Sequence, residues 1–250
     1  MRILISNDDG IHAPGLKALE RIARALSDDV WVVAPENERS GAGHSLTLHR
    51  PVRARRISRR RFAIDGTPTD CVMMAIHRLI PDQKPDLVLS GVNRGGNVAD
   101  DVTYSGTIAV AIEATMLGLP AIAMSQEYDN GARVHWSTAE RHAPDLIRRL
   151  VAAGWLGNVL VNVNFPAVAA AEVRGISVCR QGRHKFGDVI SERIDPRGRP
   201  YYWIGGVIGR EQAVPGTDVA ALEAKEIAVT PLSLDLSHGP TLAALKDALR

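Results

Sequence analysis

Residues 3–15 read ILISNDDGIHAPG, and this stretch determines how the rest of the chain can be arranged. The apolar run at residues 3–5 is typical of a short buried strand. Two adjacent carboxylates, Asp8 and Asp9, follow the run, and Pro14 then opens a helical pattern. Because ligands in an open α/β sheet bind beyond the carboxyl ends of the strands, we expect a binding site here.

Two adjacent aspartates repel each other, and a divalent cation with oxygen ligands is the usual partner that offsets the repulsion. A turn with a helix cap is the alternative, because Asp and Gly are common turn residues. This segment alone leaves both alternatives open. It is not a dinucleotide-binding fingerprint, since no G-x-G-x-x-G follows the strand.

The composition is that of an ordinary globular protein. The chain has 250 residues, of which 45% are hydrophobic and 23% charged, and its net charge of +2 indicates no particular partner. No apolar run reaches about 18 residues and no basic, apolar leader opens the chain, so we expect neither a membrane span nor a signal peptide. Cys71 and Cys179 fit no metal-binding spacing, so we expect reduced thiols in a cytoplasmic protein.

Strand-like and helix-like segments alternate through residue 164. Strands are expected at residues 3–5, 30–34, 52–57, 61–64, 86–91, 121–124 and 159–163. Helices are expected at residues 14–26, 71–80, 105–117 and 136–153. Residues 108–117 of the third helix are apolar almost all round, so this helix should be buried. The alternation predicts an α/β fold with one doubly wound, mostly parallel sheet.

The last third of the chain has a different pattern. Strands are expected at residues 173–179, 189–194, 201–208 and 226–235, and an amphipathic helix at residues 240–249. The second and third of these strands predict a protruding β-hairpin at about residues 185–210. A two-stranded ribbon is marginally stable alone, so we expect the ribbon or the terminal helix to pack on another subunit.

Four oxygen-bearing residues follow the ends of expected strands: Asp8, Asp9, Ser40 and Asn93. If these strands are parallel neighbours, the four side chains converge on one edge of the sheet. Oxygen ligands suit Mg²⁺ or Mn²⁺ better than Zn²⁺, which prefers His and Cys. The pattern therefore favours a hard divalent cation at this edge.

The same edge should hold Gly91, Gly95, Gly96 and the first turn of the helix at residues 105–117. Glycines let a ligand approach the backbone, and the N–H groups at a helix start favour an anion such as phosphate. A hard cation beside a phosphate-binding helix start indicates metal-assisted chemistry on a phosphate ester.

Several motifs together resemble the SurE (survival protein E) family of nucleotidases, and the resemblance runs in order through residues 1–166. It rests on ILISNDDGIHAPG (3–15), PENERSGAGHS (35–45), DGTPTDCV (65–72), LVLSGVNRGGNVADDVTYSGTIAVAIEA (87–114) and VNVNFP (161–166). The hairpin and the strand at residues 226–235 fit the family's layout more loosely.

The resemblance implies a single Rossmann-like α/β domain over residues 1–250, with its core at residues 1–166 and 226–236. It implies a metal-dependent phosphatase that hydrolyses nucleoside 5′- and 3′-monophosphates, and it leaves open an exopolyphosphatase activity. One divalent metal ion per subunit, Mg²⁺ or Mn²⁺, is expected. The resemblance also implies a homodimer or homotetramer with exchanged C-terminal elements; no membrane or nucleic-acid polymer is expected as a partner.

The family's functional residues carry over without substitution. The implied metal ligands are Asp8, Asp9, Ser40 and Asn93. The implied phosphate- and substrate-binding residues are Ser40, Gly41, Asn93, Asn97, Ser105, Gly106 and Thr107. The implied catalytic residues are Asp8, Asp9, Asn97 and Ser105.

The mechanism has three alternatives. A metal-activated water attacks phosphorus while Asn97 and Ser105 hold the phosphate, or Asp8 acts as a covalent nucleophile. Haloacid-dehalogenase-type phosphatases use such a nucleophile in an Asp-x-Asp spacing, whereas the two carboxylates here are adjacent. The third alternative is a metal-dependent nucleotide sensor without turnover. Ser105 itself could be a helix cap, a phosphate ligand or both.

Overall fold

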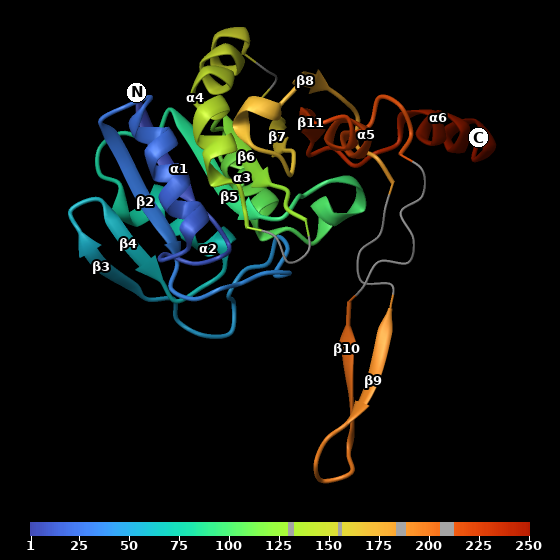
Figure 1. The fold of residues 1–250 in the computed structure, drawn as a ribbon, viewed down its shortest axis with the longest axis horizontal. Helices are drawn as coiled ribbons and strands as arrows, with labels where there is room; N and C mark the ends of the chain where they lie inside the picture. The colour runs from blue at the N-terminus through green and yellow to red at the C-terminus, as the bar shows by residue number, and fades with distance from the viewer. Residues whose placement is uncertain (130–132, 155–156, 184–188, 206–212) are drawn as a thin grey trace.

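The structure is a computed structural model of the 250-residue chain, and it describes all residues except 130–132, 155–156, 184–188 and 206–212. Figure 1 shows a layered α/β body from which a two-stranded ribbon and a C-terminal helix project. Among the described residues, the structure contains no helix that is both long and apolar enough to span a membrane.

A nine-stranded sheet forms the centre of the described residues, in the order β3-β4-β2-β1-β5-β6-β7-β11-β8. Its strands are β1 (Arg2–Ser6), β2 (Asp29–Pro35), β3 (Ala54–Ser58), β4 (Arg61–Ile64), β5 (Leu87–Arg94), β6 (Ala121–Gln126), β7 (Val159–Phe165), β8 (Gly175–Val178) and β11 (Glu226–Ser233). Only the pairs β3–β4 and β7–β11 are antiparallel. The predicted mostly parallel α/β sheet is therefore confirmed.

Helices cover both faces of the sheet. The α-helices are α1 (Pro14–Arg24), α2 (Pro68–Met74), α3 (Gly106–Met116), α4 (Trp136–Ala153), α5 (Asp218–Glu223) and α6 (Gly239–Ala248). Shorter helical turns lie at Ala75–Leu79, Ala99–Thr103 and Ala170–Glu172. Apolar residues of α1 and α4 pack in one core, and those of α2 and α3 pack in a second core on the opposite face. This two-sided cover confirms the doubly wound arrangement, and α3 is buried almost all round, as predicted.

The direction of winding reverses next to β1. From β1 the chain moves through β2 to β4 on one side, and it returns to place β5, β6 and β7 on the other side. The reversal leaves a crevice beyond the carboxyl ends of β1 and β5, which is where open α/β sheets bind ligands. The segment at residues 7–13 therefore meets the end of β5, as Ser6 pairs with Ser90 in register.

Strand β5 is longer than predicted, because it continues from Leu87 to Arg94 rather than ending at Gly91. Gly91 has φ +117°, and a Cβ there would lie 2.2 Å from the carbonyl oxygen of Met124. The register with β6 slips at this point, as in a β-bulge. Such a bulge re-aims the end of the strand, so Asn93 and Arg94 extend the sheet at the crevice instead of belonging to a loop.

The C-terminal third departs from the prediction in several bounds. Strand β8 is shorter than the expected 173–179, and the ribbon consists of β9 (Ile190–Ile194) and β10 (Pro200–Ile204), which pair antiparallel. Residues 206–208 of the expected second ribbon strand lie outside the described residues. Helix α5 was not predicted. Its fully buried Asp218 accepts hydrogen bonds from the backbone N–H groups of Ala99 at 2.9 Å and Gly182 at 2.8 Å.

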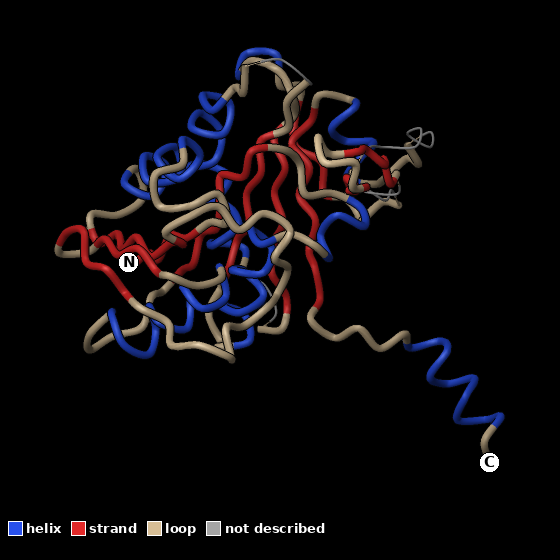
Figure 2. Tube along the Cα trace, turned by 90° about the horizontal axis from the view of Figure 1, so that it is seen from below, coloured by secondary structure: helices blue, strands red, loops and turns tan. Residues whose placement is uncertain are grey.

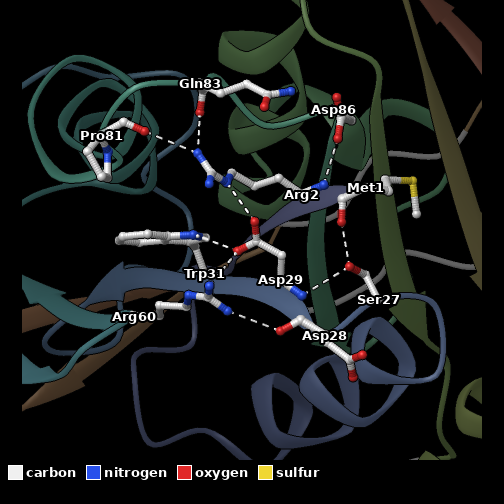
Figure 3. Close-up of polar contacts among 10 residues, drawn as sticks. All are labelled: Met1, Arg2, Ser27, Asp28, Asp29, Trp31, Arg60, Pro81, Gln83 and Asp86. Carbon is white, nitrogen blue, oxygen red and sulfur yellow. Dashed lines mark hydrogen bonds and ion pairs between the residues drawn. The ribbon is translucent and has the colours of Figure 1, made fainter.

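The amino end of the sheet, opposite the crevice, is held by the side chain of Arg2 (Figure 3). The Nε atom donates to Asp29 at 2.9 Å, and Nη1 donates to the carbonyl oxygens of Pro81 at 3.1 Å and Gln83 at 2.7 Å. Burial alone would raise the pKa of Asp29. The hydrogen bond and charge of Arg2, with the charge of Arg60, outweigh this effect and lower the pKa.

We expect Arg2→Met to lower the free energy of unfolding by about 2 kcal/mol, because bonds to charged groups contribute about 1.5–3 kcal/mol. A carboxylate with a lowered pKa stabilises the fold above its unfolded pKa of about 3.9 and loses this effect as the pH falls. The difference from wild type in urea unfolding should therefore shrink at pH 3. The phosphatase activity that the resemblance implies for the opposite edge should not change, and a loss of that activity without a loss of stability would contradict this structural role.

Candidate active site at the crevice

Asp8 follows β1, and its side chain lies against the start of α3, where it is only 4% exposed. The hydroxyl of Thr107 donates to its Oδ1 atom at 2.5 Å. Burial raises the pKa of Asp8, and hydrogen bonds from this hydroxyl and from the backbone N–H groups of Gly106 and Thr107 oppose the rise. The helix start that the sequence predicts as a phosphate site thus receives a carboxylate of the chain itself.

Gly106 makes this close approach possible. A Cβ at Gly106 would lie 2.6 Å from the Cβ of Asp8 and 2.9 Å from its Oδ2 atom. Beside it, the hydroxyl of Ser105 accepts a hydrogen bond from the backbone N–H of Ile108 at 3.0 Å, which is the geometry of a helix cap. The roles of Ser105, Gly106 and Thr107 in phosphate binding stay predictions.

Asp9 is half-buried beside Asp8. Burial first, and then the charge of Asp8, raise the pKa of Asp9 to about 7. A hydrogen bond from the backbone N–H of Arg94 and the positive charge of its guanidinium act in the opposite direction, while Glu38 adds to the repulsion. The influence of Arg94 therefore does not fully offset the burial and the repulsion that raise the pKa of Asp9. Arg94 was missed by the sequence reasoning, which expected it in a loop.

Ser40 and Asn93 are each next in sequence to a residue whose backbone N–H binds the pair. The backbone N–H of Arg39, which precedes Ser40, donates to the carbonyl oxygen of Asp8 at 2.7 Å, and that of Arg94, which follows Asn93, binds Asp9. The Ser40 hydroxyl donates to Glu38 at 2.9 Å. The Nδ2 atom of Asn93 donates to the carbonyl oxygen of Gly95 at 2.9 Å. This bond does not use the side-chain Oδ1 atom of Asn93, which is the atom that can bind a cation.

The loop that carries Ser40 and the exposed Gly41 is held against α3. The backbone N–H of Gly43 donates to the carbonyl oxygen of Tyr104 at 3.1 Å. The Nε2 atom of His44 lies 2.8 Å from an oxygen of the buried Glu113. Glu113 is the one charged residue of α3. A single charge in such an apolar helix was the sequence signal that could have indicated a polar partner such as His44.

Asn97 lies in a buried network at the carboxyl ends of β6 and β7. Its Nδ2 atom donates to the hydroxyl of Ser125 at 2.7 Å, and its backbone N–H donates to Asn164 at 2.8 Å. Its backbone carbonyl oxygen accepts hydrogen bonds from the Nδ2 atoms of Asn162 at 2.8 Å and Asn164 at 3.1 Å. Asn162 and Asn164 thus hold the backbone of Asn97. Two polar residues at alternating positions of a buried strand were the signal that could have revealed them.

The residues at the crevice fit a hard divalent cation. Two carboxylates with raised pKa values lie together, and a cation would offset both their burial and their mutual repulsion. In the part of the chain that the structure describes, no group of three or more His, Cys, Asp or Glu side chains could hold a metal ion. A cation here would therefore need neutral oxygens such as those of Ser40 and Asn93, and oxygen ligands favour Mg²⁺ or Mn²⁺.

In metal-free protein we expect Asp9→Asn to be more stable than wild type at pH 7, by about 1–3 kcal/mol. Between the unfolded pKa of about 3.9 and the folded pKa of about 7, folded Asp9 retains a proton that the unfolded chain releases. Rising pH therefore favours unfolding of wild type over this window, and the Asn variant lacks this contribution. Urea unfolding with EDTA at pH 4 and pH 7 measures it; equal pH dependence in both proteins would contradict the raised pKa.

Comparisons with known proteins agree on one family. Residues 3–188 match the family described as Survival protein SurE. The chain is 58% identical over 248 residues to the 5′-nucleotidase SurE of Paramagnetospirillum magneticum, covering 99% of this chain and 95% of that protein. It is 54% identical over 252 residues to the 5′-nucleotidase SurE of Parvibaculum lavamentivorans, covering 100% and 91%. The crystal structure of the SurE protein from Aquifex aeolicus superposes with a TM-score of 0.87 at 36% identity, covering 100% of both chains.

Proposed function

Because this chain belongs to the SurE family, we propose that it is a metal-dependent phosphatase that hydrolyses nucleoside 5′- and 3′-monophosphates to the nucleoside and phosphate. The names of its relatives support the nucleotidase class and the 5′ substrate. The observation that carries the metal dependence is the adjacent pair Asp8 and Asp9, buried together at the crevice with raised pKa values. We propose one Mg²⁺ or Mn²⁺ per subunit.

Asp8, Asp9, Ser40 and Asn93 would hold the cation. When bound, it supplies Lewis-acid activation of a phosphoryl oxygen and lowers the pKa of a water. The chain's own contribution is to orient these ligands. Thr107 and the first turn of α3 fix the carboxylate of Asp8, and the β-bulge at Gly91 directs Asn93 to the crevice.

Three further groups would act on the phosphate. The charge of Arg94 lies close enough to affect Asp9, so it can also attract the anionic substrate. Asn162 and Asn164 fix the backbone of Asn97, so that its side-chain amide would be held in place to donate a hydrogen bond to the phosphate. Ser105 would add a hydroxyl, although the structure shows that hydroxyl as the acceptor of the α3 cap.

The burial of Asp8 favours a ligand over a nucleophile. An attacking carboxylate oxygen must reach phosphorus, whereas Asp8 is 4% exposed and its Oδ1 atom accepts from Thr107 at 2.5 Å. A cation-holding carboxylate needs a fixed orientation and low exposure, which these contacts provide. Water would therefore carry out the attack on phosphorus.

A panel of phosphate-release assays tests the proposed function. Nucleoside 5′-monophosphates, nucleoside 3′-monophosphates and tripolyphosphate are each incubated with the protein and Mg²⁺ or Mn²⁺. We expect release from both classes of nucleotide, and the tripolyphosphate arm decides whether an exopolyphosphatase activity is present. Binding of nucleotides without any release would instead identify a sensor.

We also propose a homodimer or homotetramer in which C-terminal elements pack on a partner subunit. Helix α6 has no buried residue and stands away from the body (Figure 2). Its Leu242 and Leu245 are exposed, as is Leu249 directly after its end. The ribbon exposes Ile194 and Trp203. Apolar side chains on two projecting elements are typical of an interface rather than a free surface.

Light scattering at micromolar concentration should therefore give the mass of a dimer or tetramer, and Leu245→Glu should weaken the assembly because it places a charge on the apolar face of α6. Lys246→Glu, at the neighbouring position, is the matched control. A wild-type monomer with full activity would contradict the proposed assembly.

We also propose a cytoplasmic location, since Cys71 and Cys179 are both free and buried.

A further inference from the structure

A cleft of about 480 Å³ opens beside Asp9, at the first turns of α1 and α4. These two helices lie side by side on one face of the sheet (Figure 1), and both begin at the carboxyl edge. Its lining includes Asp9, Gly15, Glu38, Arg94, Arg133 and Trp136. The volume falls in the range of about 300–1,000 Å³ that small-molecule sites occupy. Because Asp9 lines it, the cleft is continuous with the proposed metal centre.

Part of the cleft lining is apolar and aromatic. Trp136 begins α4 and is half-buried against the core beneath α1. Gly15 allows this packing, since a Cβ there would lie 3.1 Å from the edge of the indole and 1.9 Å from the carbonyl oxygen of Val92. The indole is therefore a fixed, flat surface that lines the cleft beside the start of α1.

The cleft lining also contains charged residues, and their formal charges balance. Asp9 and Glu38 contribute two acids, while Arg94 and Arg133 contribute two bases. The guanidinium of Arg94 lies 5.0 Å from the ring centroid of Tyr128, which restrains it. The carboxylate of Glu38 accepts a hydrogen bond from the hydroxyl of Ser40 at 2.9 Å, so it already binds a hydroxyl group.

From this arrangement we propose that the cleft binds the nucleoside part of the substrate, with the base against Trp136 and the ribose hydroxyls donating to Glu38. The inference rests on the proposed function, because it takes the phosphate to lie at Asp8 and Asp9. An uncharged base and sugar suit a lining whose formal charges balance and that includes an aromatic surface. The same lining offers a polyphosphate chain no net positive charge to attract it.

The test uses the full-length protein in EDTA, with adenosine and uridine as probes in calorimetric titrations. Stacking of a base on an aromatic ring contributes about 1–3 kcal/mol, so Trp136→Leu should weaken nucleoside binding by about tenfold. Trp136→Phe keeps an aromatic face and should stay within about threefold of wild type. Glu38→Gln should weaken adenosine binding more than 2′-deoxyadenosine binding, and thermal unfolding checks that each variant is folded.

A second arm measures hydrolysis with Mg²⁺ or Mn²⁺. Trp136→Leu should raise KM for nucleoside 5′-monophosphates about tenfold at unchanged kcat, and it should leave kcat/KM for ribose 5-phosphate, which lacks a base, unchanged. Nucleoside binding that is equal in wild type and Trp136→Leu, or absent in both, would overturn the inference while leaving phosphatase activity in place. Trp136-dependent nucleoside binding without any phosphate release would support the cleft and overturn the proposed function.

Discussion

Asp8→Asn should lower kcat/KM for nucleoside 5′-monophosphates by about a thousandfold, equivalent to about 4 kcal/mol. The substitution keeps the volume of the side chain and removes one of the two adjacent negative charges. It also places an amide where the hydroxyl of Thr107 and the N–H groups of Gly106 and Thr107 all donate. Both the affinity for a divalent cation and the orientation of the remaining oxygen should therefore suffer.

The phosphate-release assay measures this effect, and titration calorimetry with Mn²⁺ measures the affinity for the metal. Asp145→Asn is the matched control, because it removes an exposed carboxylate from α4. The control should keep full activity. Should Asp8→Asn retain more than about a tenth of wild-type kcat/KM, Asp8 would be only a partner of the α3 start and no part of the centre.

Gly106→Ala should lower kcat/KM by about a hundredfold. The new Cβ would lie 2.6 Å from the Cβ of Asp8, so either the carboxylate or the first turn of α3 must move. Alanine is otherwise favoured over glycine in a helix by about 1 kcal/mol. A loss of activity would therefore reflect the displacement of Asp8 rather than a weaker helix.

Gly157→Ala is the control for this variant, since a Cβ at that position meets nothing within 4 Å. Kinetics and thermal unfolding are measured on both proteins. The Gly157 variant should match wild type in both. Wild-type kinetics in Gly106→Ala would show that the approach of Asp8 to α3 is irrelevant to catalysis.

The order of the elements was predictable because apolar periodicity reports burial directly. The run at residues 3–5 and the almost wholly apolar helix at residues 105–117 both proved to be buried as predicted. The end of β5 was not predictable. Its continuation to Arg94 depends on a bulge at Gly91, where a neighbouring strand leaves no room for a side chain, and sequence periodicity does not report such a contact.

In the candidate site, too, some features were predictable from the sequence and others depend on contacts between distant segments. Asp8 and Asp9 stand out in the sequence because two adjacent acids after a buried strand need a partner. The groups that hold the pair come from distant segments, Thr107 for Asp8 and Arg94 for Asp9, and Asn97 is likewise held by the distant Asn164. The strand order and the packing of α3 on the sheet bring these segments together, so their pairing could not be read from local patterns.

The most direct test of the account is phosphate release from a nucleoside 5′-monophosphate by protein stripped of metal. Wild-type protein in EDTA should release no phosphate above background, and addition of excess Mg²⁺ or Mn²⁺ should restore turnover. Asp9→Asn should need much more metal and remain slower at saturation. Release at the full wild-type rate in EDTA, or by Asp9→Asn in EDTA, would contradict a metal centre built on Asp8 and Asp9.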